Sequence, residues 1–108
     1  MAKDERFMWI LVFFDLPVKK RTERRTATKF RNGLLKDGYM MLQYSIYARP
    51  CKGRERLEKH VKRLKSDLPP QGNIRLLELT DIQFNRMQCI VGKVKEDETN
   101  GQRELFVF

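Results

Sequence analysis

The sequence predicts an α+β domain in which two helices lie on one face of an antiparallel sheet. One observation behind this prediction is the order of the apolar patterns along the chain, which is strand, helix, one or two strands, helix and strand. Another is that both helical patterns are amphipathic, so each helix has a single apolar face to bury against a sheet. The length of 108 residues fits one domain with a modest but adequate core.

The first predicted element is a strand over residues 7–14. All eight of its residues are apolar (FMWILVFF), and the run ends at Asp15-Leu16-Pro17. A short continuous apolar run bounded by turn residues is typical of a strand that is buried on both faces. Asp15 is therefore expected where a buried strand reaches the surface.

A helix and a strand-like segment follow. Residues 20–36 predict an amphipathic helix that ends at Asp37-Gly38. Its apolar residues at helical spacing are Ala27, Phe30 and Leu34. Residues 39–49 (YMMLQYSIYAR) are rich in aromatic and β-branched residues but contain no Asn-Gly or Gly-x pair that would mark a hairpin. This segment is expected to form one bent strand or two strands.

The second half of the chain repeats the alternation. Residues 54–68 predict another amphipathic helix, which Pro69-Pro70 ends. Its apolar stripe consists of Leu57, Val61, Leu64 and Leu68. Residues 73–80 (NIRLLELT) predict a largely buried strand before a turn around Asp81, and a further short strand is expected at residues 87–94.

The C-terminal segment changes character along its length. Residues 95–103 are largely polar and predict an exposed loop, whereas residues 105–108 (LFVF) are all apolar. These last residues form either an edge strand of the same sheet or a strand added to the sheet of a second protomer. The expected division is a ferredoxin-like βαββαβ domain at residues 1–94 and, at residues 95–108, a C-terminal loop and strand that packs on the partner protomer.

The charge of the chain favours an anionic partner. Lys and Arg number 23 against 14 Asp and Glu, so the formal net charge is +9. Such an excess favours nucleic acid or another anionic surface. A membrane span is not expected, because the longest apolar run is far shorter than the roughly 20 residues a spanning helix needs and no signal-peptide pattern follows it. We therefore expect a cytoplasmic protein.

The residue types present exclude several kinds of site. With two cysteines, one histidine and no CxxC spacing, the chain predicts neither a disulfide framework nor a zinc site, and Cys51 and Cys89 are expected to be reduced thiols. The single histidine, His60, lies beside an apolar stripe and is expected to be structural. No Gly-rich phosphate loop and no Ser/His/Asp or Cys/His set is visible. The chemistry that remains is a carboxylate with a metal ion.

Asp15 is the candidate for that carboxylate. The cations that follow it and would hold a polyanion nearby are Lys19, Lys20, Arg21, Arg24 and Arg25. A carboxylate beside bound phosphate suggests a divalent metal, and guanidinium groups would clamp phosphates bidentately. The alternative is that Asp15 is a turn former before Leu-Pro and that the cations are a solvated helix start.

A series of motifs occurs in a specific order and spacing. It comprises Phe14-Asp15-Leu16-Pro17, Lys29-Phe30-Arg31, Lys36-Asp37-Gly38-Tyr39, residues 41–47 (MLQYSIY) and Thr80-Asp81-Ile82-Gln83-Phe84. This series resembles CRISPR-associated protein 2 over residues 7–87, and the phrase around Gln43 is most similar to the form found with type II CRISPR systems.

The resemblance implies a homodimer whose C-terminal strand crosses to its partner. Members of that family act in spacer acquisition, where the dimer holds a short DNA duplex between two dimers of the CRISPR integrase. Several are described as Mg²⁺-dependent endonucleases on RNA or double-stranded DNA. By the same resemblance, Asp15 is the metal ligand of the catalytic site, and two copies of it face each other across the dimer axis. One carboxylate alone is a poor ligand set for Mg²⁺, so activity would depend on the dimer.

Ser45 and the tyrosines have alternative roles. The resemblance implies that Ser45 hydrogen-bonds a phosphate or the water shell of the metal, whereas the simpler interpretation is a buried hydroxyl that caps a strand. The three tyrosines, Tyr39, Tyr44 and Tyr47, would stack on bases in a single-strand binder, but at strand spacing they are more often core or interface residues.

Three functions remain open from the sequence. The chain is a Mg²⁺-dependent endonuclease of CRISPR adaptation, a DNA-holding scaffold for the integrase with little or no catalysis of its own, or a toxin-like stand-alone endoribonuclease of related fold. A carboxylate beside a basic surface is compatible with both of the first two, so only chemistry separates them.

Overall fold

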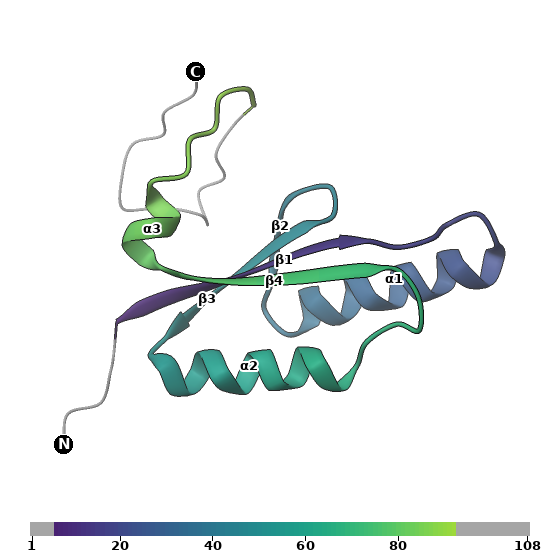
Figure 1. Ribbon diagram of the computed structural model, residues 1–108, viewed down its shortest axis with the longest axis horizontal. Helices are drawn as coiled ribbons and strands as arrows, with labels where there is room; N and C mark the ends of the chain where they lie inside the picture. Colours follow the sequence, from purple (N-terminus) through teal and green to yellow (C-terminus); the bar gives the residue numbers. More distant parts are fainter. Residues whose placement is uncertain (1–5, 93–108) are drawn as a thin grey trace.

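The computed structural model describes residues 6–92, which contain four strands and three helices (Figure 1). In chain order these are β1 (Phe7–Asp15), α1 (Arg21–Lys36), β2 (Met40–Gln43), β3 (Ile46–Lys52), α2 (Arg54–Ser66), β4 (Asn73–Thr80) and α3 (Asp81–Asn85). The helix starting at residue 20 and the strand at residues 73–80 were therefore predicted to within one residue at these boundaries.

The strands form one antiparallel sheet in the order β2-β3-β1-β4. Both long helices, α1 and α2, lie on the same face of this sheet (Figure 1). Within residues 6–92, β1 and β3 are central and β2 and β4 are the edges. This is the ferredoxin-like arrangement, so the predicted α+β fold is confirmed. The expected C-terminal strand at residues 105–108 lies outside the described residues.

The segment at residues 39–49 forms two strands rather than one bent strand. A turn at Tyr44 and Ser45 joins β2 to β3, and Ser45 has a φ of 66°. A non-glycine residue in this left-handed region is uncommon. Because the residue with positive φ is a serine, the sequence of the turn contains neither the Gly nor the Asn that usually marks a hairpin.

The end of α2 and the segment after α3 differ from the prediction. α2 ends at Ser66 instead of residue 68, and Leu68 is 51% exposed. The residue before a proline is disfavoured in helical conformation, which accounts for the early end of the helix. The strand expected at residues 87–94 is wrong for the part that the structure describes, where residues 87–92 contain only a single bridge residue, Cys89. Ile90 and Val91 are 61% and 89% exposed, so this apolar stretch does not pack as a strand there.

α3 begins where the sequence predicted only a turn. The hydroxyl of Thr80 accepts a hydrogen bond from the amide of Gln83 at 3.1 Å, and the side-chain oxygen of Gln83 accepts one from the amide of Thr80 at 2.9 Å. This reciprocal pair is a capping box, which satisfies two backbone donors at a helix start. α3 therefore has a sequence signature of its own.

Apolar side chains pack on both faces of β1. Ile10, Val12 and Phe14 belong to the core beneath α1 and α2. On the other face, the ring of Trp9 stacks on Phe84 of α3 with centroids 3.8 Å apart, and its Nε1 donates a hydrogen bond to Asp81 at 2.7 Å. The apolar run of β1 is explained because α1 and α2 cover one of its faces and α3 covers the other face at Trp9.

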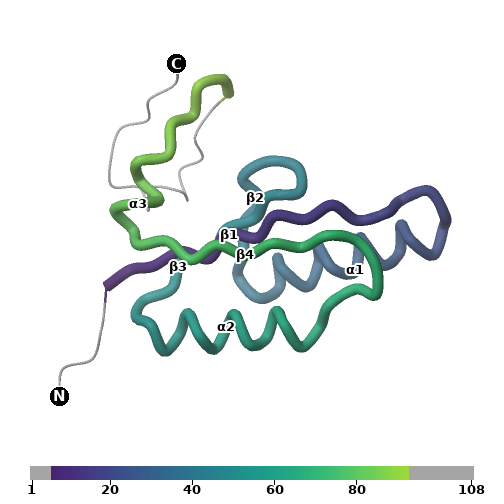
Figure 2. Tube along the Cα trace, viewed as in Figure 1, coloured from purple at the N-terminus to yellow at the C-terminus, as the bar shows by residue number. Residues whose placement is uncertain are grey.

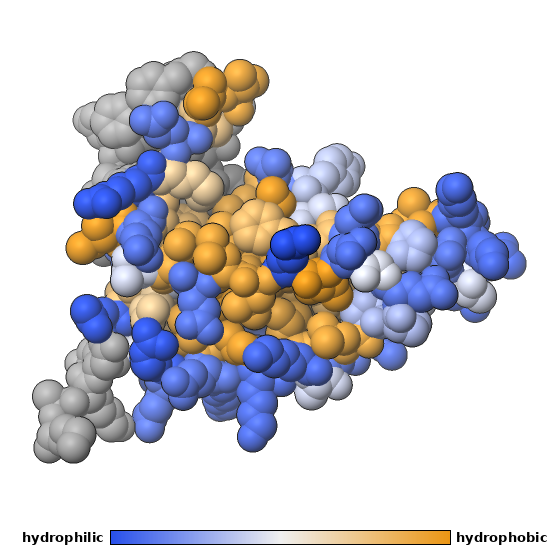
Figure 3. Space-filling model, in the orientation of Figure 1, coloured by the Kyte–Doolittle hydropathy of each residue, from blue (hydrophilic) through white to orange (hydrophobic). Residues whose placement is uncertain are grey.

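We call the face of the sheet away from α1 and α2 the open face. Near Asp15 its apolar side chains are less well covered than near α3, since Leu77 of β4 is 47% exposed and Phe13 of β1 is only half-buried. Apolar side chains also gather along β4 in the space-filling view (Figure 3). The edge strand β4 and the adjoining open face thus present an apolar surface.

The structure also describes the two cysteines and the length of the helices. Cys51 and Cys89 are free cysteines, and Cys51 is buried. None of the helices in residues 6–92 is long and apolar enough to cross a membrane.

Candidate functional site

Asp15 lies exposed at the C-terminal end of β1, as the sequence predicted. It is directly opposite Asn73 of β4 in the antiparallel ladder. Side chains alternate between the two faces of a strand, and Phe14 belongs to the core beneath the helices. Asp15 therefore shares the open face with Phe13.

Two neighbouring segments fix the backbone around Asp15. On one side, the amide of Phe14 donates a hydrogen bond to the carbonyl oxygen of Ser45 at 3.0 Å. On the other side, Gly72 has a φ of +107°, and a Cβ built there would lie 2.7 Å from the carbonyl oxygen of Asp15. Only glycine permits this conformation and this close approach. The carboxylate is thus presented from a strand end that two chain segments hold in place.

Ser45 is exposed in the β2–β3 turn, so it is not the buried strand cap that the simpler interpretation proposed. Its carbonyl oxygen bonds Phe14, the residue immediately before Asp15. The structure therefore places Ser45 and Asp15 at the same end of the sheet.

Two residues that the sequence interpretation did not select lie close to Asp15 on the open face. Asn73 is its direct cross-strand partner, and Arg75 lies opposite Phe13. Diagonal cross-strand neighbours are separated by roughly 7–8 Å, within reach of a long side chain. Both residues are exposed. In the sequence, the alternation with Ile74 and Leu76, which pack on the core, places Asn73 and Arg75 on the opposite face of the strand. Only the strand register shows that these two residues lie beside Asp15.

The five predicted phosphate-binding cations are all exposed. The chain runs out beyond the sheet after β1 before α1 begins, as the trace shows (Figure 2). Lys19 and Lys20 lie in this loop. Arg21, Arg24 and Arg25 instead line a shallow surface depression along α1, which Asp15 does not line. The remaining residues of this depression are Thr28, Lys29 and Asn32.

Arg24 also has a structural role. One nitrogen of its guanidinium donates hydrogen bonds to the carbonyl oxygens of Val18 at 3.2 Å and Lys19 at 2.8 Å. The amide of Lys20 in the same loop donates to the carboxylate of Glu23 at 2.8 Å. An acidic group in the first turn offsets part of the unfavourable interaction between the cations and the positive end of the helix dipole. The basic surface is therefore carried on a loop with its own internal contacts.

The oxygen donors around Asp15 suit Mg²⁺ in type but not in number. A carboxylate and an amide oxygen are hard ligands of the kind that Mg²⁺ prefers. Within residues 6–92, however, no three His, Cys, Asp or Glu side chains come together as a potential metal site. A metal ion at Asp15 would need further oxygen ligands from phosphate or from a second copy of the chain.

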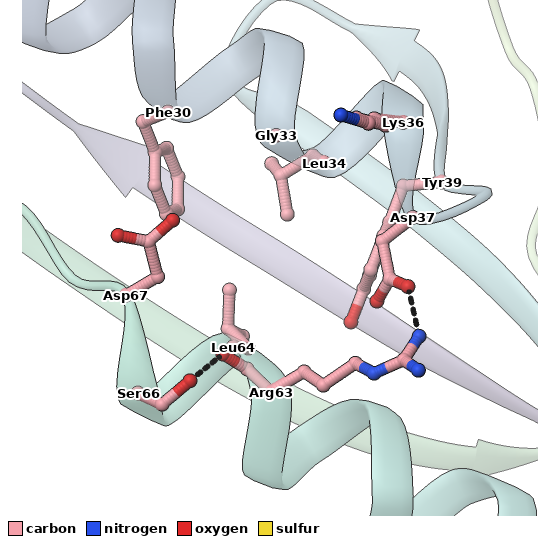
Figure 4. A pocket seen from close by; sticks show the side chains of 10 residues that line it. All are labelled: Phe30, Gly33, Leu34, Lys36, Asp37, Tyr39, Arg63, Leu64, Ser66 and Asp67. Carbon is pink, nitrogen blue, oxygen red and sulfur yellow. Dashed lines mark hydrogen bonds and ion pairs between the residues drawn. The ribbon is translucent and has the colours of Figure 1, made fainter.

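A second polar cluster lies elsewhere, at the C-terminal end of α1 and in the C-terminal half of α2 (Figure 4). The carboxylate of Asp37 bonds His60 Nδ1 at 2.9 Å and Arg63 at 2.8 Å. Burial raises the pKa of the Asp37 carboxyl, but the hydrogen bonds and charges of His60 and Arg63 lower it by more, so that it lies below the ordinary value of 3.8. His60 is buried and tied to α1, in keeping with the structural role expected for it.

A cavity of about 470 Å³ adjoins this cluster. Its lining combines apolar side chains with the ion pair just described, and consists of Phe30, Gly33, Leu34, Lys36, Asp37, Tyr39, Arg63, Leu64, Ser66 and Asp67. The cavity lies between α1 and α2, on the face of the sheet that these helices cover (Figure 4). Its residues hold the two helices together and are not part of the Asp15 site.

Comparison with known proteins gives a consistent family. Residues 8–87 match the family model described as CRISPR associated protein Cas2. A protein of Flavobacterium psychrophilum named CRISPR-associated endoribonuclease Cas2 is 48% identical over 103 residues, covering 94% of this chain and 90% of that relative. Proteins of the same name from Campylobacter jejuni and Parvibaculum lavamentivorans are 41% and 42% identical, over 97% and 94% of this chain and 74% and 100% of those relatives.

Proposed function

This chain belongs to the CRISPR-associated Cas2 family, and from that membership we propose that it is a dimeric, Mg²⁺-dependent endonuclease whose catalytic carboxylate is Asp15. The observation that carries the proposal is the position of Asp15, exposed at the end of the central strand β1 and directly opposite Asn73. The relatives named above are called endoribonucleases, which supports RNA as a substrate. Double-stranded DNA is the other substrate that we expected from the sequence.

A second copy of the chain would complete the site. The open face near Asp15 carries Leu77, which is 47% exposed, and the half-buried Phe13. Burial of apolar surface favours association at about 25 cal/mol per Å² before the costs of association are subtracted. Pairing of two open faces would bring two copies of Asp15 together, and the LFVF segment at residues 105–108 would add a strand to the partner's sheet at edge strand β4.

The chain's own residues suit the handling of a phosphodiester. Two Asp15 carboxylates, with Asn73 beside each, would hold one Mg²⁺ together with the substrate phosphate. The metal would supply polarisation of a phosphate oxygen and a lowered pKa of water. Arg75 lies opposite Phe13, two residues from Asp15, and would pair with the same phosphate, which a guanidinium does bidentately. Ser45 is exposed at the same end of the sheet and would donate a hydrogen bond to the phosphate.

The basic surface of α1 would hold a longer nucleic acid by its backbone. The depression carries charges from Arg21, Arg24, Arg25 and Lys29, which would act on phosphates of any sequence. In spacer acquisition this surface would contact the DNA that the CRISPR integrase receives. The binding would be strongly salt-dependent, because each phosphate contact releases counterions.

A non-catalytic scaffold is the second candidate function. It is favoured by one observation, namely that the basic depression along α1 does not include Asp15. In a scaffold the depression would hold duplex DNA for the integrase while Asp15 takes no part in chemistry. A stand-alone toxin-like endoribonuclease, the third function open from the sequence, is disfavoured by membership of the Cas2 family.

The test is cleavage of single-stranded RNA and duplex DNA by the purified protein with Mg²⁺ or with EDTA. The variant is Asp15→Asn, which keeps the shape of the side chain, and the matched control is Glu58→Gln at an exposed position of α2. An endonuclease centred on Asp15 predicts Mg²⁺-dependent cleavage by the wild type and Glu58→Gln and a loss of at least 100-fold in Asp15→Asn, about 2.7 kcal/mol of barrier. If all three proteins bind DNA and none of them cleaves it, the non-catalytic scaffold is the function that is supported. Equal cleavage by all three would contradict a role for Asp15.

A further inference from the structure

The three tyrosines of the chain have very different environments. Tyr39 and Tyr47 are 4% and 2% exposed and belong to the core beneath the helices, which confirms the core role expected of them. Tyr44, in contrast, is 90% exposed. A large aromatic ring in water at a tight turn contributes little to the stability of this protomer, and its face is accessible to a ligand.

The turn that carries Tyr44 is fixed to the candidate site. Gln43 and Ile46, on either side of the turn, are paired with each other in the β2–β3 ladder. Ser45, the neighbour of Tyr44, has a φ of 66°, and its carbonyl oxygen accepts the hydrogen bond from the amide of Phe14 at 3.0 Å. Figure 1 shows this turn beside the C-terminal end of β1. The ring of Tyr44 is therefore attached to a short, bonded turn next to the strand end that carries Asp15.

The two neighbours of β1 then supply different chemistry around Asp15. β4 contributes Asn73 and the cation Arg75, which suit a phosphate. The β2–β3 turn contributes an aromatic face, which suits a nucleobase, because stacking of a base on an aromatic side chain is favourable for every base type. A nucleotide whose phosphate lies at Asp15 would thus have its base within the region of Tyr44.

We propose that Tyr44 stacks on a base of the nucleic acid bound at Asp15 and thereby positions the substrate at this site. The base must be unpaired, because the faces of bases in a duplex are already covered by their neighbours and exposing one requires unstacking. The inference rests on the proposed function, because it places the phosphate at Asp15. It adds a residue that positions the substrate.

The test compares Tyr44→Ala with the conservative Tyr44→Phe, which keeps the ring and removes only the hydroxyl. Each protein is titrated into a single-stranded RNA oligonucleotide that contains 2-aminopurine, and into the duplex of the same sequence, with Ca²⁺ in place of Mg²⁺ so that a cation is present but Mg²⁺-dependent cleavage does not occur. Anisotropy of a terminal dye gives the Kd, and 2-aminopurine fluorescence reports stacking directly. Because Tyr44 is 90% exposed, neither substitution removes a core contact within the described residues.

We expect Tyr44→Ala to weaken single-strand binding by roughly 5- to 150-fold and to abolish the change in 2-aminopurine fluorescence. Tyr44→Phe should match the wild type, and duplex binding should change by less than about twofold in both variants. Unchanged single-strand binding and fluorescence in Tyr44→Ala would overturn the inference. So would a loss of the dimer in Tyr44→Ala by sedimentation, because Tyr44 would then be an interface residue.

Failure of this inference is distinguishable from failure of the proposed function. If the wild type cleaves in an Asp15-dependent manner while Tyr44→Ala binds and cleaves as the wild type does, only the role of Tyr44 is overturned. If the wild type neither binds nor cleaves single-stranded RNA, the role of Tyr44 is overturned together with RNA as a substrate.

Discussion

The backbone amide of Phe14 donates a hydrogen bond to the carbonyl oxygen of Ser45, with 3.0 Å between nitrogen and oxygen. This bond joins the end of β1 to the β2–β3 turn, so Asp15 and Ser45 belong to one rigid region. The geometry depends on the left-handed conformation of Ser45, which has a φ of 66°.

Substitutions at Ser45 distinguish the role of its backbone conformation from the role of its hydroxyl. Ser45→Gly keeps access to positive φ, so we expect stability within about 0.5 kcal/mol of the wild type and an effect confined to nucleic-acid affinity. Ser45→Val forces a β-branched residue into the left-handed region and should cost roughly 1–3 kcal/mol. Urea denaturation gives both values. Equal stability of the two variants would show that the turn is not constrained as described.

Gly72 supports Asp15 from the side of β4. A Cβ at Gly72 would lie 2.7 Å from the carbonyl oxygen of Asp15, at a φ of +107°. We expect Gly72→Ala to destabilise the protein by roughly 1–3 kcal/mol and to lower cleavage by displacing Asp15. The control is Gly33→Ala in α1, where a Cβ meets nothing within 4 Å and the change should stabilise by about 0.5–1 kcal/mol. A neutral Gly72→Ala would contradict the close approach.

The ion pair of Asp37 with His60 and Arg63 predicts a pH dependence of stability. Its carboxyl has a pKa below the ordinary 3.8 despite burial, which acts in the opposite direction. A depressed pKa in the folded state stabilises the protein above the unfolded-state pKa, and this contribution disappears as the pH falls through the folded-state value. We therefore expect Asp37→Asn to cost about 1–3 kcal/mol at pH 7 and the difference from wild type to shrink below about pH 4.

The measurement for Asp37 is urea denaturation from pH 7 to pH 3. Asp67→Asn serves as control, since Asp67 is an exposed carboxylate lining the same cavity. Its effect should stay within about 0.5 kcal/mol at every pH. A gap between Asp37→Asn and wild type that is constant or widens toward low pH would contradict the assignment.

The basic surface of α1 predicts a particular salt dependence. Arg21→Gln and Arg25→Gln should each weaken binding to duplex DNA of any sequence and reduce the slope of log affinity against log salt by about one. Arg24→Gln should do the same and also lower stability, because its guanidinium bonds Val18 and Lys19. Lys52→Gln is the control, since Lys52 pairs with Phe7 at the opposite end of the sheet. An unchanged slope in all three arginine variants would place the DNA elsewhere.

The fold was largely predictable from the sequence because its signals are local. The apolar run of β1 and the helical stripes of α1 and α2 each specify an element without knowledge of its neighbours. The β2–β3 turn was not predictable in the same way, because Ser45 adopts a positive φ, a conformation that serine rarely adopts. α3 has a local signal as well, because Thr80 and Gln83 have the spacing of a capping box, but the sequence analysis predicted only a turn there.

The site was predictable only in part. Asp15 is recognisable because a buried strand ends on it, but Asn73 and Arg75 reach it through strand register, which depends on tertiary pairing. The sequence groups Arg21 and Arg25 with Asp15 because they are near in the chain, but only the structure shows that both line a depression that Asp15 does not line. Apolar character at residues 87–92 suggested a strand, yet Val91 is 89% exposed.

The most direct test of the central claim is the activity of a dimer in which one protomer carries Asp15→Asn. Co-expression with two different affinity tags and sequential purification give this mixed dimer, and its size is checked by sedimentation. If two Asp15 carboxylates form one centre, its Mg²⁺-dependent cleavage of single-stranded RNA will be as low as that of the double variant. Half of the wild-type activity would mean that each protomer works alone and would contradict a shared site.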